Sequence, residues 1–490
     1  MPKFEIKHEK TGEVLFSGKA SSLKELVQRA VHFGSDASLL QMAVTKLGLK
    51  KVGKMRLYGA NLAEADLSEI DLTEADFSGS NLSKSKLEGS CLKKGIFSRC
   101  NLSNTDMTRT TLSDCNLTEA NLFRANLSKA IIDTANFTGA NLNCANLAGN
   151  KLSKANFTKA DLSEAVLTSS DMSRIQLSGN KLTKADLSWG VLSKARIERA
   201  DLTGANLERA DLSDAKLIGA TLVNANLKEA NLSGADLAGA DLTGADLSAA
   251  NLSGAKLTNA KLPKTNLNGS KLIRAEGFNC DLSGAAVRDS DLTGANFSSS
   301  QLVETDFSKS ILVSANFSNA QMQGAVLTRT NLQEADFQKA AAQNADFSQA
   351  SGEKVDFSGA VLQGANLQEA NFFKAKLERA DLSSANVSKA SFRDGDLTRV
   401  IALATIFVSA DLQNTSFKDA DVSAADFTNA NFSGVTMSQV AAVNANLTGT
   451  DFSWAFIDNT DFSGVKISGT KMRGAKLTAV KGIKLKKKEA

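Results

Sequence analysis

The sequence is poor in the residues on which most catalytic and metal-binding sites depend. Its 490 residues include only 2 Pro, 2 His, 2 Trp and 1 Tyr. His8 and His32 have no neighbouring Cys or Ser motif that would form a nucleophilic dyad. The phosphate-binding motif G-x-x-x-x-G-K-[ST] and the zinc motif H-E-x-x-H are both missing. We therefore expect a non-enzymatic protein with no cofactor, no metal and no small-molecule substrate.

Long apolar runs are also missing, which bears on where the protein works. No stretch approaches the roughly 18 apolar residues that a membrane span needs. The N-terminal segment MPKFEIKHEKTGEV lacks the apolar region of a signal peptide. We expect no membrane span and a cytoplasmic location. Export by a route without a Sec signal, or association with a particle, stays open.

Paired cysteines are missing too. The five cysteines are Cys91, Cys100, Cys115, Cys144 and Cys280. Their number is odd and no C-x-x-C pair occurs, so they predict neither a disulfide framework nor a zinc site. Cys100, Cys115 and Cys280 stand where the repeat described below usually has Ala, which predicts small buried side chains in a reducing compartment.

The net charge of +4 hides an uneven distribution. Residues 1–60 carry 11 Lys and Arg against 5 Asp and Glu, and residues 471–490 carry 8 against 1. The remaining 410 residues carry 38 Lys and Arg against 47 Asp and Glu. The ends are therefore basic and the long middle is only mildly acidic, far from the charge density of a nucleic-acid duplex.

One regularity dominates the sequence: a large apolar residue, here called a centre, returns at every fifth position. The series runs from Leu57 to Leu477 with no shift in register, which makes 85 consecutive units. The residue two before a centre is usually Ala, the residue one before is commonly Asp or Asn, and the residue one after is commonly Ser or Thr. Five centres are small instead: Gly277, Ala342, Gly352, Ala402 and Ala442.

A period of five fits neither an α-helix, with a period of 3.6, nor a pleated strand, with a period of 2. It is typical of a coil that turns a corner every five residues. The centre and the small residue two before it then point inward, and the other three residues point to solvent. Such coils must stack, because one coil alone buries little surface.

The motif A-(D/N)-(L/F)-(S/T)-x resembles that of the bacterial and phage pentapeptide-repeat proteins, and residues 57–477 match it almost unbroken. The resemblance implies an all-β solenoid, namely a right-handed quadrilateral parallel β-helix with four pentapeptides per coil. At this size the repeats predict about 21 coils, stacked at about 4.8 Å. The side that contains Phe77 carries nine Phe centres, which predicts two stretches of stacked rings inside it.

The two ends do not repeat. We expect residues 1–52 to form a small α+β N-terminal cap, residues 53–480 the β-helix, and residues 481–490 a basic C-terminal tail. Within the cap, Phe4–Lys7 and Glu13–Phe16 predict a β-hairpin. Two helices are predicted after it, the first from Ser21/Ser22 to Gly34 and the second over Ala37–Leu47.

Bulky apolar residues in outward positions are the candidates for partner contacts. Trp189 and Trp454 stand two residues after a centre, and Phe123 and Phe373 stand one after. A second group surrounds the small centre Ala402. It consists of Ile401, Ile406 and Val408. This group predicts either a contact patch or a local distortion in which neighbours turn inward to fill the space beside Ala402.

The basic tail offers a different kind of candidate. Its lysines are Lys484, Lys486, Lys487 and Lys488. They either keep the protein soluble, bind an anionic partner such as nucleic acid or a membrane surface, or contact another protein or a second copy. We expect a monomer or an end-to-end dimer.

Three functions fit these features. The first is a rod-like scaffold that displays contacts to a protein partner of unknown identity at fixed spacing. The second is a secreted effector or a phage- or particle-associated structural component. The third follows from the resemblance, because some pentapeptide-repeat proteins are acidic mimics of DNA that bind type II topoisomerases such as gyrase. The mild charge of the middle disfavours this third function.

Overall fold

The structure is a computed structural model that describes residues 3–7, 14–19 and 56–483. It consists of two compact units, Met1–Asp236 and Leu237–Ala490. Each unit is described by itself, and the domain boundaries expected from the sequence stay a prediction.

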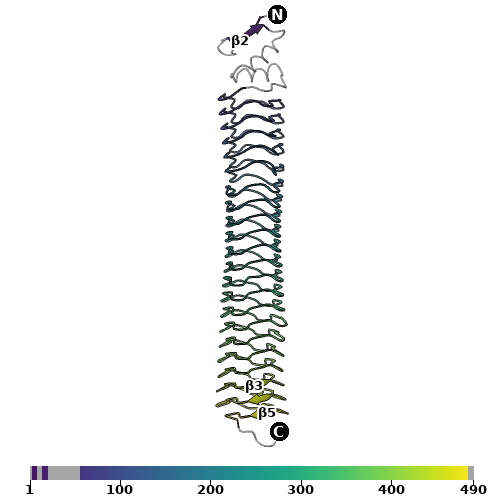
Figure 1. Ribbon diagram of the computed structural model, residues 1–490, viewed down its shortest axis with the longest axis vertical. Coiled ribbons are helices and arrows are strands. Elements are labelled where there is room, and N and C mark those ends of the chain that lie inside the picture. The colour runs from purple at the N-terminus through teal and green to yellow at the C-terminus, as the bar shows by residue number, and fades with distance from the viewer. Residues whose placement is uncertain (1–2, 8–13, 20–55, 484–490) are drawn as a thin grey trace. The chain divides into compact units, whose positions relative to one another are not determined.

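In each unit the chain forms stacked coils of 20 residues (Figure 1). Most residues one before a centre make a parallel bridge to a residue 20 positions further on, such as Asn61 to Asn81 in the first unit and Asp336 to Asp356 in the second. One coil therefore holds four pentapeptides, as the family resemblance implied. We number the four sides by their centres: side 1 contains Leu57, side 2 Leu62, side 3 Leu67 and side 4 Leu72, with each twentieth centre thereafter.

The repeat motif follows from how each backbone amide finds an acceptor, as residues 161–165 illustrate. The amides of Asp161, Leu162 and Glu164 donate to carbonyls of neighbouring coils at 2.8–3.0 Å. The Ala165 amide donates to the Leu162 carbonyl at 3.1 Å and closes the turn. The remaining amide, that of Ser163, donates to Oδ1 of Asp161 at 3.0 Å. Asp or Asn precedes the centre because its side chain accepts from the one amide that no backbone carbonyl reaches.

The corners are β-turns with a left-handed residue two after the centre. Glu164 has a φ of 57°, and the same slot has a positive φ in repeat after repeat. A positive φ at the third turn residue together with the closing hydrogen bond is the signature of a type II turn. Glycine fits this slot without strain, which explains its frequency there.

The core consists of the centres and the small residues, as predicted. Leu212 and Ala210 are fully buried, and the residues between one centre and the next small residue are half-buried or exposed. The predicted ring stacking on side 1 is confirmed: Phe77 and Phe97 lie 5.0 Å apart, and in the second unit Phe337 lies 5.1 Å from Phe357. Cys100, Cys115 and Cys280 are buried, also as predicted.

Regular strands are short. The ladders are mostly single bridges, and they widen only at three parallel strands of the second unit, β3 (Thr436–Ser438), β4 (Phe456–Asp458) and β5 (Lys476–Thr478). The predicted N-terminal hairpin is confirmed, because β1 (Lys3–Lys7) pairs antiparallel with β2 (Val14–Lys19). The helices predicted over 21–34 and 37–47 lie outside the described residues. In the described part of the chain, no helix has the length and hydropathy to span a membrane.

Candidate interaction surfaces

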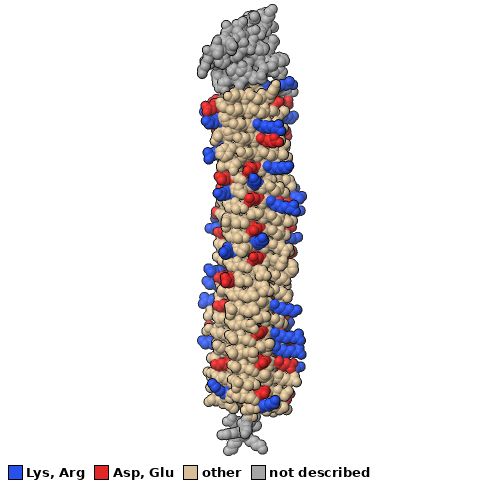
Figure 2. All heavy atoms as spheres, turned by 90° about the vertical axis from the view of Figure 1, so that its left-hand side faces the viewer, with Lys and Arg blue, Asp and Glu red and all other residues tan. Residues whose placement is uncertain are grey.

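The walls of the coils mix positive and negative charge. Residues 20 positions apart lie on consecutive coils, so a cation often meets a carboxylate there: Arg99 Nε lies 2.8 Å from Glu119 Oε2 in the first unit. In the second unit, Lys389 Nζ lies 3.5 Å from Glu369 Oε1. Figure 2 shows Lys and Arg interspersed with Asp and Glu over the visible face of each unit. Such pairs are exposed and contribute little to stability, but they leave the walls without a field of one sign.

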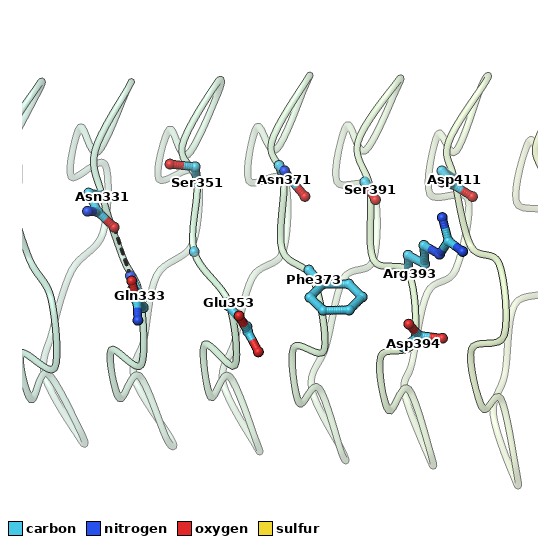
Figure 3. Close-up of a pocket in the computed structure, with 11 residues that line it drawn as sticks. Asn331, Gln333, Ser351, Glu353, Asn371, Phe373, Ser391, Arg393, Asp394 and Asp411 are labelled. Carbon is cyan, nitrogen blue, oxygen red and sulfur yellow. Dashed lines mark hydrogen bonds between the residues drawn. The ribbon is translucent and has the colours of Figure 1, made fainter.

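A hollow in the described walls lies on side 4 of the second unit. This side-4 groove has a volume of about 760 Å³. Figure 3 shows two parallel columns of side chains, one residue per coil in each, with Phe373 projecting between polar neighbours. The lining residues are Asn331, Gln333, Ser351, Gly352, Glu353, Asn371, Phe373, Ser391, Arg393, Asp394 and Asp411.

The small centre Gly352 lies at the middle of this groove. A Cβ on Gly352 would come within 2.6 Å of Val355 Cγ2 and 2.7 Å of the Leu332 carbonyl carbon. Val355 is fully buried in a slot that usually holds Ala, so its larger side chain occupies space that a normal centre would fill. The backbone at Gly352 therefore lies close to Val355 and Leu332, and Gly352 is itself one of the residues that line the groove.

The core explains why a small centre occurs there. The coil of Gly352 also contains Phe337 and Phe347, whose ring centroids are 5.7 Å apart in an edge-to-face arrangement. Its fourth centre is Ala342, which is also buried. Two large and two small centres thus share one cross-section, so the rings occupy part of the space that the small centres leave.

The groove combines one apolar ring with charged and amide groups. Lys374 Nζ lies 4.7 Å from the centre of the Phe373 ring, and Glu353 lies 4.0 Å from Lys374 and 3.6 Å from Lys354. A cation over an exposed ring contributes about 0.5–1 kcal/mol and orients both side chains. The surface can therefore offer hydrogen bonds, charge and a flat apolar contact to one extended ligand.

Trp189 lies at the corner after side 3 in the first unit and is 55% exposed. The guanidinium of Arg209, one coil on, lies 4.7 Å from the ring centre, and Arg209 Nε also donates to Glu229 at 2.8 Å. Trp454 lies at the corner after side 4 in the second unit and is 66% exposed, with Arg473 6.0 Å from its ring. Both tryptophans are therefore at the surface, as expected of contact residues. Their roles in binding stay predictions.

The segment around Ala402 is regular. Ala402 is buried while Ile401 and Ile406 are exposed and Val408 is half-buried. Ile401 and Ile406 keep their bridges to the next coil, and turning either of them inward would break those bridges. The distortion suggested by the small centre is therefore wrong, and the apolar patch remains. Leu403, which is also exposed, extends it.

The sequence candidates do not converge on the side-4 groove. None of Trp189, Trp454, Ile401, Ile406 and Val408 lines it. The tail candidates Lys484, Lys486, Lys487 and Lys488 lie outside the described residues. Sequence reasoning flagged Phe373 as an outward ring and Gly352 as an irregular centre, but not that the two are neighbours across one coil. The spacing of 21 residues, one coil plus one position, is the signal that would have joined them.

Reactive groups are few in the described part of the chain. No cluster of three or more His, Cys, Asp and Glu side chains is placed there to hold a metal. Burial raises the pKa of the Cys100, Cys115 and Cys280 thiols to about 12. Burial also raises the pKa of Asp336, and the neighbouring Asp356 adds to this shift. The walls are therefore suited to binding, and these described groups form no evident acid–base pair.

Comparison with known proteins points to one family. A family model described as pentapeptide repeats matches most of the coil region, and a second model described as a pentapeptide repeat region matches residues 290–367. The segments matched by the first model are 56–93, 96–133, 130–168, 170–209, 210–248, 250–276, 356–399, 405–440 and 444–481. No curated protein matches the chain.

Several solved structures align with parts of the chain. HetL from the cyanobacterium Nostoc sp. strain PCC 7120, a pentapeptide repeat protein involved in heterocyst differentiation regulation, is 25% identical over 40% of this chain and 87% of its own, with a TM-score of 0.20. QnrB1, a plasmid-mediated fluoroquinolone resistance protein, is 22% identical over 39% of this chain and 88% of its own, with a TM-score of 0.22. A pentapeptide repeat protein from the Arabidopsis thaliana thylakoid lumen is 26% identical over 28% of this chain and 70% of its own, with a TM-score of 0.13.

Proposed function

The chain belongs to the pentapeptide-repeat family, and from that premise we propose that it is a non-enzymatic scaffold that binds a protein partner along the walls of its coils. The observation that carries this proposal is the side-4 groove of the second unit. It presents one side chain per coil in each of two columns, so its groups recur about every 4.8 Å along the axis of that unit. An extended polypeptide segment has polar groups and side chains that can follow such a surface.

Phe373 is the expected anchor of the contact. It is the aromatic residue of the groove, and it lies between Glu353 one coil before and Arg393 one coil after. Aromatic residues surrounded by polar groups are typical of the few positions that carry most of the binding free energy of an interface. A partner segment with an apolar side chain over Phe373, flanked by a basic and an acidic residue, fits this arrangement.

The experiment compares Phe373→Ala with Phe123→Ala in the full chain. Phe123 is a matched control, because it stands in the same slot of its repeat and also carries a cation over its ring, Arg124 at 5.0 Å. Partners are captured from an extract of the source organism, purified, and measured by isothermal titration calorimetry. We expect Phe373→Ala to lower the affinity for the main partner by about tenfold or more, and Phe123→Ala to change this affinity little. Equal binding by both variants would exclude the groove as the contact.

The mixed charge of the walls supports no mimicry of DNA. A duplex carries one negative charge per roughly 1.7 Å, whereas here cations and carboxylates alternate on consecutive coils, as Arg209 and Glu229 do. We expect no effect of the protein on supercoiling by gyrase at equimolar concentration. An effector or a particle component would also need a wall that binds a partner. Fractionation of the native host distinguishes these roles from that of a cytoplasmic scaffold.

A further inference from the structure

The last coil that the structure describes differs from those before it in how well its centres are covered. The centres of the preceding coil, Leu447, Phe452, Ile457 and Phe462, are at most 2% exposed. In the last coil Ile467 is 43% exposed, and Met472 and Leu477 are half-buried. These three side chains, called the apolar end, come from three different sides of the coil. They leave an apolar floor at this end of the second unit.

A ring of lysines surrounds the apolar end. Three lysines of the last coil directly precede its centres, namely Lys466, Lys471 and Lys476, and Lys481 holds the same slot on the fourth side, before Gly482. All four are exposed. The same slots one coil earlier hold Asn446, Asp451, Phe456 and Asp461, so no lysine occupies them there. Between residues 462 and 483 the sequence has five Lys and Arg and no Asp or Glu. This run of one charge sign contrasts with the mixed walls elsewhere.

Only part of the ring is offset by carboxylates. Lys471 Nζ lies 3.7 Å from Asp451, and Lys481 lowers the pKa of Asp461, after the larger effect of hydrogen bonds from Ser463. Lys466 and Lys476 instead bridge through their backbones to Asn446 and Phe456, neither of which carries charge. The ring therefore keeps a net positive field at the rim of the apolar end.

Two exposed aromatic residues stand at the same rim. Trp454 lies at the corner between sides 4 and 1, and Phe456 follows it and begins β4, which pairs with β5 of the last coil. A Cβ on Gly474 would overlap the Trp454 ring, so the indole lies flat against this glycine in the last coil. Its other face stays open, because the side chain is two-thirds exposed.

We propose that this end of the second unit docks on an anionic membrane surface, with the apolar end and Trp454 at the interface and the lysine ring against the lipid headgroups. Aromatic side chains such as Trp favour the boundary between headgroups and hydrocarbon. Lysines near an anionic leaflet are attracted to it, and this attraction amounts to about a fivefold gain in binding for each of them. An apolar surface surrounded by cations combines the two contributions.

The geometry favours a plane over other anionic partners. The four lysines lie on four different sides of one coil, so a linear polyanion running along a wall would meet only one or two of them. A flat anionic surface perpendicular to the axis of the unit meets all four. A second copy docked end to end would bring two like-charged rings together, which is unfavourable.

The test uses the full chain with Trp189→Phe, which leaves Trp454 as the sole tryptophan. The probes are vesicles of phosphatidylcholine with about one-third phosphatidylserine, and vesicles of phosphatidylcholine alone. We expect co-sedimentation with the anionic vesicles only, a blue shift of the Trp454 emission, and quenching by brominated acyl chains. Changing all four ring lysines to Gln should weaken binding by about 100-fold or more, given about fivefold for each lysine.

Two controls distinguish the lysine ring and Trp454 from Trp189 and from the tail lysines. In the reciprocal variant Trp454→Phe, the remaining Trp189 should show no blue shift although the protein still sediments. Changing Lys484, Lys486, Lys487 and Lys488 to Gln should lower the affinity but keep the shift of Trp454. Thermal melts check that each variant keeps its fold.

Any of four outcomes would overturn the proposal. They are no binding to anionic vesicles, binding without a change at Trp454, loss of binding only when the tail lysines are changed, and tighter binding to a single-stranded oligonucleotide than to the vesicles. The last outcome would assign this end to nucleic acid. Sedimentation velocity without lipid adds the remaining alternative, because a dimer broken by changes at Ile467 would assign the apolar end to a second copy.

Discussion

The two units use one backbone rule but fill their cores differently. In the first unit the Phe centres occur only as two stacked pairs on side 1, Phe77 with Phe97 and Phe137 with Phe157. In the second unit Phe centres occur on all four sides, and rings also meet edge to face. All five small centres lie in the second unit.

This difference teaches how a uniform repeat makes a non-uniform surface. A coil of four medium centres keeps its walls alike, and the first unit consists of such coils apart from its stacked pairs. Some coils with large rings also hold small centres, as the coil of Phe337 and Phe347 does with Ala342 and Gly352, whereas the coil of Phe357 and Phe372 holds two Leu instead. Because the interior is close-packed, the neighbouring side chains must adjust to each such combination. The small centre Gly352 lies in the side-4 groove, so we expect the volume of the core side chains to affect the binding surface there.

The largest expected effect comes from removing a ring in each unit. Phe337 contacts Phe317, Phe347 and Phe357 at centroid distances of 5.1–5.7 Å, whereas Phe97 contacts Phe77 alone at 5.0 Å. We expect Phe337→Ala to cost about 5 kcal/mol and Phe97→Ala about 3 kcal/mol of local stability. Hydrogen exchange of amides in the flanking coils measures both, because solenoids open locally. Equal losses of stability in the two variants would mean that contacts between rings contribute nothing beyond the burial of each ring.

The next effect tests the compensation at the groove. Gly352→Leu should destabilise its coil by about 1–3 kcal/mol, because the new side chain meets Val355 and the Leu332 backbone. Adding Val355→Ala restores the usual pair of a large centre and a small neighbour, so the double variant should recover part of the loss.

The matching control is Val355→Ala alone, which should cost about 1 kcal/mol for the methyl groups removed. A double-mutant cycle from hydrogen exchange then gives the coupling. Strictly additive changes would show that the two residues do not share one space. The double variant should also reduce the volume of the side-4 groove and weaken binding of the partner that contacts Phe373.

Much of the architecture could be predicted because each repeat is a local rule applied many times. The period alone gave the corner every five residues and the inward slots. The pairing at 20 residues, and with it the stacking of Phe77 on Phe97, came from the family resemblance. The role of Asp or Asn before the centre, as the acceptor for an amide such as that of Ser163, could not be read from the pattern. It depends on which amides the coil leaves without a backbone partner.

The groove could not be predicted, because it depends on how several neighbours share volume. The sequence marked both Gly352 and Ala402 as small centres. It did not distinguish them, although Gly352 lines the side-4 groove and Ala402 does not. Gly352 has no Cβ and has the larger Val355 beside it, whereas Ala402 keeps its Cβ and has Thr405 in the corresponding slot. The outcome is set by these side-chain volumes together, not by the centre alone.

A smaller effect concerns pH, and it compares Asp with Asn in the position directly before a centre. The Ser173 hydroxyl donates to Asp171 at 2.7 Å and is the main cause of its lowered pKa. A lowered folded pKa contributes stability above the unfolded value of about 3.9, and this contribution is lost as the pH falls through the folded pKa. Asp171→Asn keeps the Oδ1 acceptor, so it should change stability at pH 7 by less than about 1 kcal/mol.

The loss of stability at acid pH should therefore be smaller in Asp171→Asn than in the parent chain. Hydrogen exchange at pH 7 and near pH 3 measures this loss. Asp171→Ala is the contrasting control, since it removes the acceptor and should cost about 1 kcal/mol at both pH values. An Asn column such as Asn101 on Asn81, linked by a hydrogen bond of 3.1 Å, has no group that titrates and should show no such pH dependence.

The smallest expected difference concerns how readily the coils of each unit open locally, which the labelling rates of their buried thiols report. Cys144 is half-buried at a corner of the first unit, whereas Cys115 in that unit and Cys280 in the second are fully buried with a pKa of about 12. A buried thiol is labelled only when its coil opens, so both should react with a maleimide at least about 100-fold more slowly than Cys144. Cys280 follows the small centre Gly277, whose place the Phe297 ring enters. If that ring restores normal packing, Cys280 and Cys115 should be labelled at rates within about threefold of each other. Much faster labelling of Cys280 would mean that small centres loosen the second unit, and that its grooves form at the expense of local stability.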